Sequence, residues 1–365
     1  MEVLHAMIED MQVGIRKNRL QRNWFCVLSL LIILSILGGC GTMPTKQAET
    51  TVAAKFPEKP ITVIVPFTAG GALDIVARAM EKKAMQYLGQ SMVVVNKPGG
   101  TGTIGWNELA GANPDGYTMG ITSPEIILNS LYGPTKYNYV TALAPVAQVT
   151  EGAMILAVRA DQPWQDLTAL VEYAKRHPGE LKFGHGGVGS LAHIMGETFA
   201  KAADISIEQV PFRGASEATA ALLGGHIQML TTNPMVISEF VKAGKIRILA
   251  IADKQRSGDS LLAQVSTFRE VGYDVVFNNR FGIAIPKEVP PDIKTKIVKG
   301  VQGIINDPEF KQDIEKLGLP VTYLNPHDTE LVWISEQQKY TEIVQATGIL
   351  EKIKEQKNSM GKIEN

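Results

Sequence analysis

Short apolar runs that end in a glycine-rich turn and open onto a helical pattern recur along this chain of 365 residues. In the first of them, residues 61–67 are nearly all apolar, Thr68-Ala69-Gly70-Gly71 forms a tight turn, and apolar residues then recur at helical spacing. A continuous apolar run of this length suits a strand that is buried on both faces, as in a parallel sheet. The repetition of this unit therefore predicts an α/β fold, in which strands alternate with helices.

The spacing of these units predicts the domain organisation. We expect further strands at 92–95, 117–121, 155–158, 181–183, 207–212, 228–231, 246–252 and 281–285. We expect helices at 73–87, 167–175, 191–202, 216–223, 291–305, 308–317 and 327–347, and one that ends at Gly244. The prediction is two α/β domains, one formed by 56–154 and 281–365 and the other by the insertion 155–280. Because the chain crosses between them twice, we expect a hinge there.

The N-terminus carries the pattern of an export signal. Basic residues precede an apolar run at 24–37, which ends in the sequence LGGC with its cysteine at Cys40. The alternative, an N-terminal membrane helix, fits less well because the run is shorter than the roughly 20 residues that a span needs. We therefore predict a lipoprotein signal peptide at 1–39, a lipid on Cys40 and a polar tether at 40–55.

Composition and charge exclude several classes of protein. Cleavage before Cys40 would leave one of the two cysteines, so we expect no internal disulfide. The 36 basic and 37 acidic residues nearly balance, which argues against a nucleic-acid partner. The six histidines form no ligand-like cluster, and export separates the protein from cytoplasmic NAD and ATP. We expect a monomer without metal or cofactor.

Two motifs typical of enzymes lack the context that they need. Gly100, Gly102 and Gly105 have the G-x-G-x-x-G spacing of dinucleotide sites, and Glu125 follows about 20 residues later, as a ribose-binding acid would. However, this loop follows the second strand of the domain, and a proline adjoins the acid. The sequence HGG at 185–187 is similar to esterase oxyanion loops, yet no G-x-S-x-G nucleophile elbow occurs. We therefore expect no enzyme.

Six segments in chain order resemble the extracytoplasmic solute receptors of tripartite tricarboxylate transporters, also called Bug-type receptors. They are PITVIVPFTAGGALDIVAR, VVVNKPGGTGTIG, NPDGYTMGITSP, LKFGHGGVGSLAHIMGETF, QVPFRGASEATAALLGGHIQML and FGIAIPKEVPPDI. The resemblance implies a two-domain, periplasmic-binding-protein type II-like (Venus flytrap) fold that closes on a small organic carboxylate. It also implies delivery to one large and one small integral membrane subunit. A binding module that feeds a sensor kinase is the alternative that the sequence leaves open.

Glycine turns at helix N-termini supply the donors that a carboxylate needs, because first-turn amides have no partner within the helix. Ligands of open α/β sheets bind where such turns follow the strands. The resemblance implies that the first loop reaches the carboxylate partly through ordered waters and that its phenylalanine lines the pocket. The candidates in the first domain are Phe67, Thr68, Ala69, Gly70, Gly71, Gly100, Thr101, Thr103 and Ser123. We expect Asp74 to fix the first loop rather than to contact the solute.

The second domain and the return to the first supply further candidates, namely His185, Gly186, Ser190, Phe212, Arg213, Asn233 and Arg280. His185 stands where relatives commonly have serine; it either donates to the ligand, as a cation near neutral pH, or occupies a solvent-exposed turn. Arg213 could hold a carboxylate with two parallel hydrogen bonds. Arg280 either contacts the solute or braces the hinge. Asn233 and the two threonines before it are neutral where many relatives have an acid, which disfavours an amino acid as ligand.

Replacing Cys40 tests the predicted lipid anchor. Cys40→Ser removes the thiol that would be acylated, so we expect the protein either to leave the membrane fraction or to remain unprocessed. Cell fractionation and the gel mobility of the precursor measure both outcomes. Correctly processed protein that is still anchored to the membrane would contradict the assignment.

Overall fold

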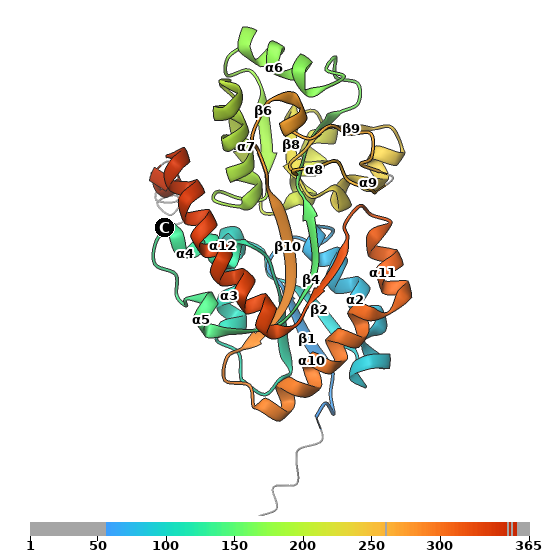
Figure 1. The fold of residues 1–365 in the computed structure, drawn as a ribbon. Coiled ribbons are helices and arrows are strands. Elements are labelled where there is room, and N and C mark those ends of the chain that lie inside the picture. Colours follow the sequence, from blue (N-terminus) through green and yellow to red (C-terminus); the bar gives the residue numbers. More distant parts are fainter. Residues whose placement is uncertain (1–55, 260, 349, 352, 356–365) are drawn as a thin grey trace, which may run out of the picture. The chain divides into compact units, whose positions relative to one another are not determined.

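The structure is a computed structural model of the chain, and it describes residues 56–259, 261–348, 350–351 and 353–355 (Figure 1). The predicted signal peptide, the lipid site at Cys40 and the tether lie outside these residues. Among the helices that are described, none combines the length and the apolar character needed to cross a membrane.

The first sheet has six strands in the order β11-β4-β10-β3-β1-β2. These are β1 (Ile61–Val65), β2 (Met92–Asn96), β3 (Thr118–Thr122), β4 (Leu143–Ala153), β10 (Asn278–Pro286) and β11 (Val321–Leu324). Strand β1 pairs in parallel with β2 and β3, whereas β10 is antiparallel to β3 and β4, and β11 is antiparallel to β4. The sheet is therefore mixed, with its parallel part at the β2 edge.

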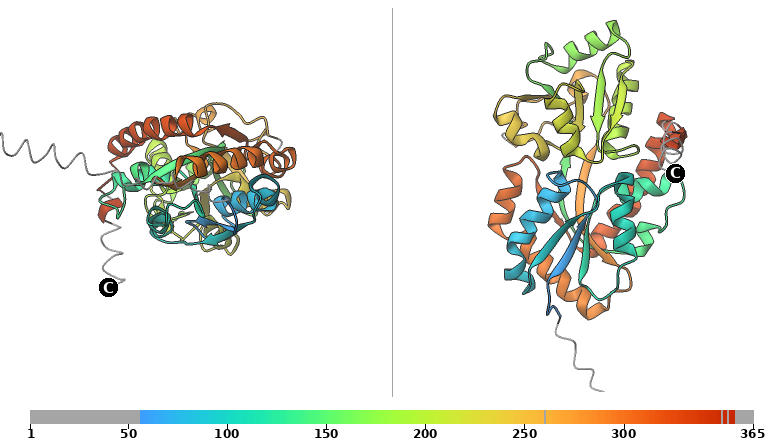
Figure 2. Two further views of the ribbon diagram at one scale, coloured as in Figure 1. Left: turned by 90° about the horizontal axis from the view of Figure 1, so that it is seen from below. Right: turned by 180° about the vertical axis from the view of Figure 1, so that it is seen from behind.

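Helices from both ends of the chain accompany this sheet. They are α2 (Ala72–Leu88), α3 (Thr103–Ala110), α4 (Glu125–Leu131), α5 (Tyr139–Ala142), α10 (Pro291–Asn306), α11 (Pro308–Glu315) and α12 (Pro326–Thr347), with the 3₁₀ turn η1 (Gly100–Gly102). Helices α2 and α3 both pack against β1, as the view from behind in Figure 2 shows. Helix α10 contacts α2 and β4. The C-terminal helices thus complete the core that the first strands begin.

The second sheet has five strands in the order β7-β6-β8-β5-β9. These are β5 (Ile155–Arg159), β6 (Lys182–His185), β7 (Glu208–Pro211), β8 (Met229–Thr232) and β9 (Ile246–Ile251). The helices between them are α6 (Leu167–Arg176), α7 (Leu191–Ala203), α8 (Ala215–Leu223) and α9 (Pro234–Lys242), followed by the 3₁₀ turn η2 (Arg269–Val271). Strand β6 is parallel to β7 and β8, and β5 is antiparallel to β8 and β9.

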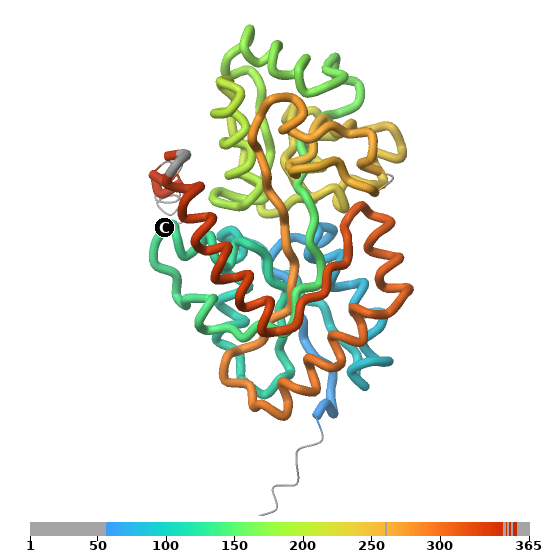
Figure 3. Tube along the Cα trace, viewed as in Figure 1, coloured from blue at the N-terminus to red at the C-terminus, as the bar shows by residue number. Residues whose placement is uncertain are grey.

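Two crossings join the two sheets. Strand β4 passes into β5 through Met154, and the chain returns from Phe277 into β10. The two crossings are hydrogen-bonded to each other, because the Met154 amide donates to the Phe277 carbonyl at 2.9 Å. Figure 3 shows them side by side, in green and orange. Below, residues 56–153 and 278–355 are called the first lobe and residues 155–277 the second lobe; the predicted domain boundaries stay a prediction.

Local sequence signals fix where many of the helices begin. A side-chain oxygen of the residue before the helix accepts a first-turn amide at five helices, with caps at Asp166, Ser190, Asn233, Asp307 and Asn325. Proline stands at the start of α9, α10, α11 and α12, where its missing N–H costs no hydrogen bond. These signals place several helix N-termini at the ends of strands, where the site is formed.

Among the ranges expected from the sequence, none corresponds to β4, β11, α3, α4 or α5, and β4 is the longest of the described strands. It contains Pro145, and proline removes a donor from the ladder and argues against a central strand. The structure accommodates it with a register shift between Ile283 and Ala284, the residue that faces Pro145 across the pair. The extra residue, Val146, lies in β4 itself, so a bulge beside the proline lets it stand in a central strand.

Candidate ligand-binding site

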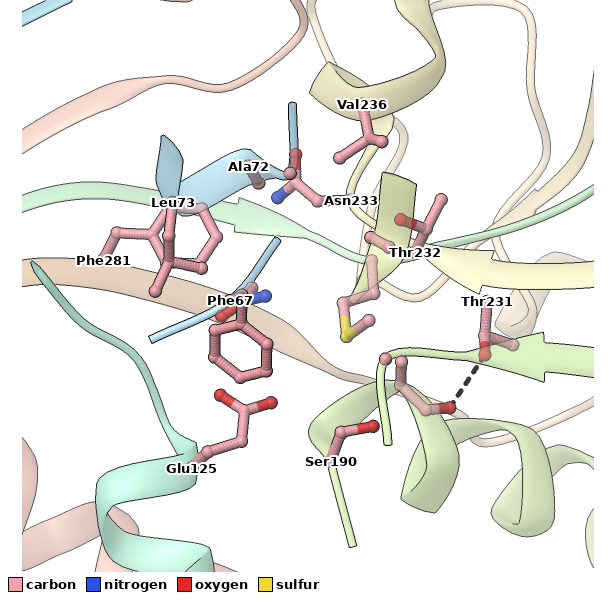
Figure 4. A pocket seen from close by; sticks show the side chains of 16 residues that line it. Phe67, Ala72, Leu73, Glu125, Ser190, Thr231, Thr232, Asn233, Val236 and Phe281 are labelled. Carbon is pink, nitrogen blue, oxygen red and sulfur yellow. Dashed lines mark hydrogen bonds between the residues drawn. The ribbon is translucent and has the colours of Figure 1, made fainter. Parts of the chain in front are cut away.

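An open pocket of about 530 Å³ lies between the loops that follow the strands of the two lobes (Figure 4). It is lined by Phe67, Gly71, Ala72, Leu73, Glu125, Met154, Gly186, Ser190, Ala192, Ala215, Thr231, Thr232, Asn233, Val236, Asn279 and Phe281. Five of these are candidates from the sequence, namely Phe67, Gly71, Gly186, Ser190 and Asn233. The structure thus brings together candidates from one loop of the first lobe and two of the second.

Four helices begin at this pocket. Helices α2 and α8 start after Gly71 and Gly214, neither of which has a side-chain cap, whereas Ser190 and Asn233 cap α7 and α9. The first-turn amides and the helix dipoles make such a place electropositive without a charged side chain. Indeed, none of the residues that line the pocket, all in the described part of the chain, is a lysine, an arginine or a histidine.

The loop between β1 and α2 is held by Asp74. Its side chain is 3% exposed, and its carboxylate accepts the Gly70 amide at 2.9 Å, Arg78 Nε at 2.9 Å and Asn96 Nδ2 at 2.9 Å. Gly70 has φ of +77°, a conformation that favours glycine. Burial alone would raise the pKa of Asp74, but the bonds from Arg78, Gly70 and Asn96 lower it below 3.8. The expectation that Asp74 fixes this loop is confirmed.

Three buried polar atoms in the pocket have no hydrogen-bond partner among the described residues: Thr232 Oγ1, Asn233 Nδ2 and Asn279 Oδ1. Asn233 Oδ1 accepts the Met235 amide at 3.1 Å, which fixes the orientation of the amide group and leaves the NH₂ end unpaired. Buried polar groups are nearly always paired in proteins, so these atoms are available to a bound molecule.

Glu125 is the acidic residue among those that line the pocket, and sequence reasoning did not select it for this site. It is 6% exposed, and its carboxylate accepts the Ser123 hydroxyl at 2.5 Å and the Leu191 amide at 3.0 Å. The Leu191 amide belongs to the first turn of α7, so a carboxylate of the first lobe caps a helix of the second. The only signal in the sequence is an acid just after a predicted strand.

The second glycine loop does not line the pocket, and this applies to Gly100, Thr101 and Thr103. Thr101 adopts a left-handed conformation with φ of +55° and donates from Oγ1 to the Val188 carbonyl of the second lobe at 2.8 Å. Thr103 Oγ1 donates to the Gly100 carbonyl at 2.9 Å. A side chain at Gly102 would meet the Trp106 ring. The loop therefore contacts the other lobe rather than the cavity.

His185 is neither an exposed turn residue nor a cation near neutral pH. Its side chain is fully buried, with Nε2 at 2.6 Å from Gln209 Oε1 and the ring stacked on that of His193 at 4.4 Å between centroids. Burial, together with His193, lowers the pKa of His185 to about 3. The exposed turn and the cation near neutral pH are thus wrong for this residue, because packing takes the ring away from solvent; His185 does not line the pocket, and its contact with a ligand stays a prediction.

Phe212 and Arg213 follow β7 but do not line the pocket. The Arg213 side chain is 73% exposed, and its guanidinium pairs with Glu217 at 2.9 Å. The Glu217 carboxylate also accepts the Arg213 amide at 3.2 Å, just as Asp74 accepts Gly70 at the start of α2. The strand end therefore serves to start α8, and its arginine turns along the helix surface rather than into the site.

Arg280 and Ser123 line a second, smaller cavity of about 290 Å³, which shares Phe281 with the first. The Arg280 guanidinium pairs with Glu336 on α12 and with Glu151 on β4, the latter at 2.5 Å. Of the two roles left open for Arg280, the structure supports the brace, because this ion pair ties β10 to β4 and α12 next to the crossings.

Hydrogen bonds join the lobes around the pocket. Thr68 Oγ1 lies 2.7 Å from Ser216 Oγ, the Tyr132 hydroxyl donates to the Gly189 carbonyl at 2.9 Å, and the Thr101 and Glu125 contacts add two more. A Cβ at Gly214 would lie 2.2 Å from Thr68 Oγ1 and 3.2 Å from its backbone nitrogen. Thr68 therefore contacts the second lobe, and Gly70 shapes the turn. Neither these two residues nor Ala69 lines the cavity.

Comparison with known proteins supplies the family. The model of the tripartite tricarboxylate transporter family receptor matches residues 76–349. The chain belongs to this receptor family. Protein BugT of Bordetella pertussis is 29% identical to the receptor over 305 residues, which are 82% of this chain and 93% of BugT.

Solved structures agree with the receptor's fold. The periplasmic binding protein BugD superposes with a TM-score of 0.77 at 28% identity, over 80% of this chain and 99% of BugD. MatC from Rhodopseudomonas palustris, solved with bound malate, gives a TM-score of 0.70 at 25% identity over 81% and 99% of the two chains. The receptor therefore has the two-domain periplasmic-binding-protein fold that its sequence predicted.

Asp74→Asn tests how the first loop is held. We expect a loss of about 1 to 3 kcal/mol in the free energy of unfolding at neutral pH, because hydrogen bonds to a charged group disappear. A carboxyl whose pKa is lowered on folding stabilises the protein above its ordinary 3.8 and loses that contribution as the pH falls through the lowered value. The difference from wild type should therefore shrink in acid.

Urea unfolding at neutral pH and below pH 3.8 measures this difference. Asp313→Asn, at a half-exposed carboxylate that pairs with Lys82, is the matched control and should change stability by no more than about 0.5 kcal/mol. A difference for Asp74→Asn that is equally large at both pH values would mean that its charge does not hold the loop.

Proposed function

We propose that this receptor binds a small organic carboxylate outside the cytoplasm and delivers it to the membrane subunits of a tripartite tricarboxylate-type transporter. The observation that carries the proposal is the pocket between the lobes, where four helices begin and no basic side chain is needed to attract an anion. Its family membership and the malate bound by MatC support the same class of ligand.

The ligand carboxylate belongs at the end of the pocket formed by α2 and α9. There the first-turn amides of Ala72 and Leu73 and the unpaired Asn233 Nδ2 offer three N–H donors. Apolar side chains, among them Phe67 and Phe281, surround the carbon chain.

Closure of the lobes gives the other sequence candidates a role. Thr68 and Thr101 bond the opposite lobe, and Gly186 and Ser190 contribute backbone and cap at the start of α7. The crossings at Met154 and Phe277 act as the hinge, so that a bound carboxylate and these contacts favour the same closed state. The membrane subunits then recognise the closed surface of a monomeric receptor that is held at the membrane through its lipid.

Calorimetry of the purified protein against mono-, di- and tricarboxylates tests the proposal. We expect heat of binding with at least one of them at a stoichiometry of one per chain. Protein that is shown to be folded and free of carried-over ligand, yet gives no heat with any of them, would sink the proposal.

Gly214→Ala tests closure. The added methyl would clash with Thr68 in the closed state, whereas the backbone at Gly214 has no positive φ and tolerates alanine. We expect affinity for the carboxylate to fall about tenfold or more, because the closed state is the one that binds, while the melting temperature of the unliganded protein changes little.

Gly258→Ala is the control for this substitution, since a Cβ there meets no atom within 4 Å. It should leave affinity unchanged. Unchanged affinity in Gly214→Ala as well would show that the Thr68 and Gly214 contact takes no part in binding.

A further inference from the structure

We infer that the carboxylate bound by this receptor also carries an ammonium group, which pairs with Glu125. The inference rests on the proposed function, because it places the ligand in the same pocket and adds a chemical group to it. It concerns Glu125, the acidic side chain among the residues that line the pocket.

Glu125 brings an uncompensated negative charge into the pocket. Its two recorded donors, the Ser123 hydroxyl and the Leu191 amide, are neutral, and no ion pair to it occurs in the described part of the chain. It is 6% exposed, and the lining residues include no cation. A buried carboxylate is retained at a cost unless an opposite charge faces it, and the ligand is the remaining source of that charge.

Glu125 also occupies one of the anion sites that the fold provides. Its carboxylate already accepts the first-turn amide of Leu191, so the N-terminus of α7 is filled by the protein itself. A second ligand carboxylate at that place would meet a like charge at short range and without solvent screening. The remaining open sites for a carboxylate are those of α2 and α8 and the amide of Asn233.

Glu125 and Asn233 therefore offer a ligand different hydrogen-bonding groups. Both residues line the pocket, and in the view of Figure 4 the Phe67 ring lies between Glu125 and Asn233. Asn233 offers an unpaired donor and Glu125 offers acceptor oxygens. An ammonium group has three donors and no acceptor, so a zwitterion with its carboxylate toward Asn233 matches both groups.

This inference reverses one expectation from the sequence. The neutral residues Thr231, Thr232 and Asn233 disfavoured an amino acid as ligand, since many relatives have an acid there. In the structure an acid reaches the same pocket from the first lobe, through Glu125 at the start of α4. It also separates this receptor from MatC, whose malate has two carboxylates and no amino group.

Matched ligand pairs test the inference on the wild-type protein. The pairs are L-aspartate with L-malate, L-alanine with L-lactate, and 4-aminobutanoate with succinate, each titrated by calorimetry. In the first two pairs a hydroxyl replaces the amino group, and in the third a carboxylate replaces the aminomethyl group. We expect the tightest ligand of the panel to carry the amino group and to bind about tenfold or more tightly than its partner.

Glu125→Gln tests the same point in the protein, because it keeps the shape and acceptor oxygen of the side chain and removes its charge. We expect the affinity for the best amino ligand to fall about tenfold or more, and that for its hydroxyl or carboxylate partner to change far less. Since Glu125 also joins the lobes, weaker closure would lower both affinities alike, and the ratio within a pair separates the two effects. Glu309→Gln, at a side chain that is 71% exposed, is the control and should change neither.

Each outcome decides the matter. A ligand without an amino group that binds most tightly overturns this inference and leaves the proposed function intact, as does a ratio that Glu125→Gln does not change. Absence of binding by any carboxylate overturns both. If Glu125→Gln fails to fold, the ranking of the wild-type pairs decides.

Discussion

The pocket of this receptor depends on how the helices around it satisfy the hydrogen-bonding needs of their first-turn amides, which have no partner within the helix. At the pocket, side chains meet this need for two helices: Asn233 caps α9, and Ser190 and Glu125 cap α7. Helices α2 and α8 start without a side-chain cap. The uncapped amides are what a ligand anion can complete. The proposed affinity for a carboxylate therefore rests on how the helices begin, since the residues that line the pocket include no basic side chain.

The same loops hold the lobes together, which links binding to shape. Thr68 and Thr101 leave glycine turns to bond the second lobe, and Gly214 leaves room for Thr68. Near the crossings, where we propose the hinge, the Arg280 ion pairs hold β10 against β4 and α12. A ligand that lies between the lobes thus acts on the same contacts that define the closed state.

Much of the fold could be predicted because its signals are local. Buried strands give continuous apolar runs, glycine marks turns with positive φ, and caps mark helix starts, so most strands and helices and the role of Asp74 follow from the sequence. Strand β4 could not be predicted in this way, since its proline contradicts the strand pattern. Only a register shift in its pairing with β10 accommodates the proline. The second glycine loop has the glycine spacing of dinucleotide-binding loops, which indicated an anion site. In the structure this loop contacts the other lobe instead.

The sequence by itself determined the α/β class, the glycine turns and the family, because these depend on periodicity and on residues close together in the chain. Only the tertiary structure decided which side chains line the pocket: Arg213 turns to its own helix, the His185 ring is buried against His193, and Glu125 enters the pocket. The physical reason is that a side chain's direction depends on partners far away in sequence. Glu125 and Leu191 meet only when the two lobes come together.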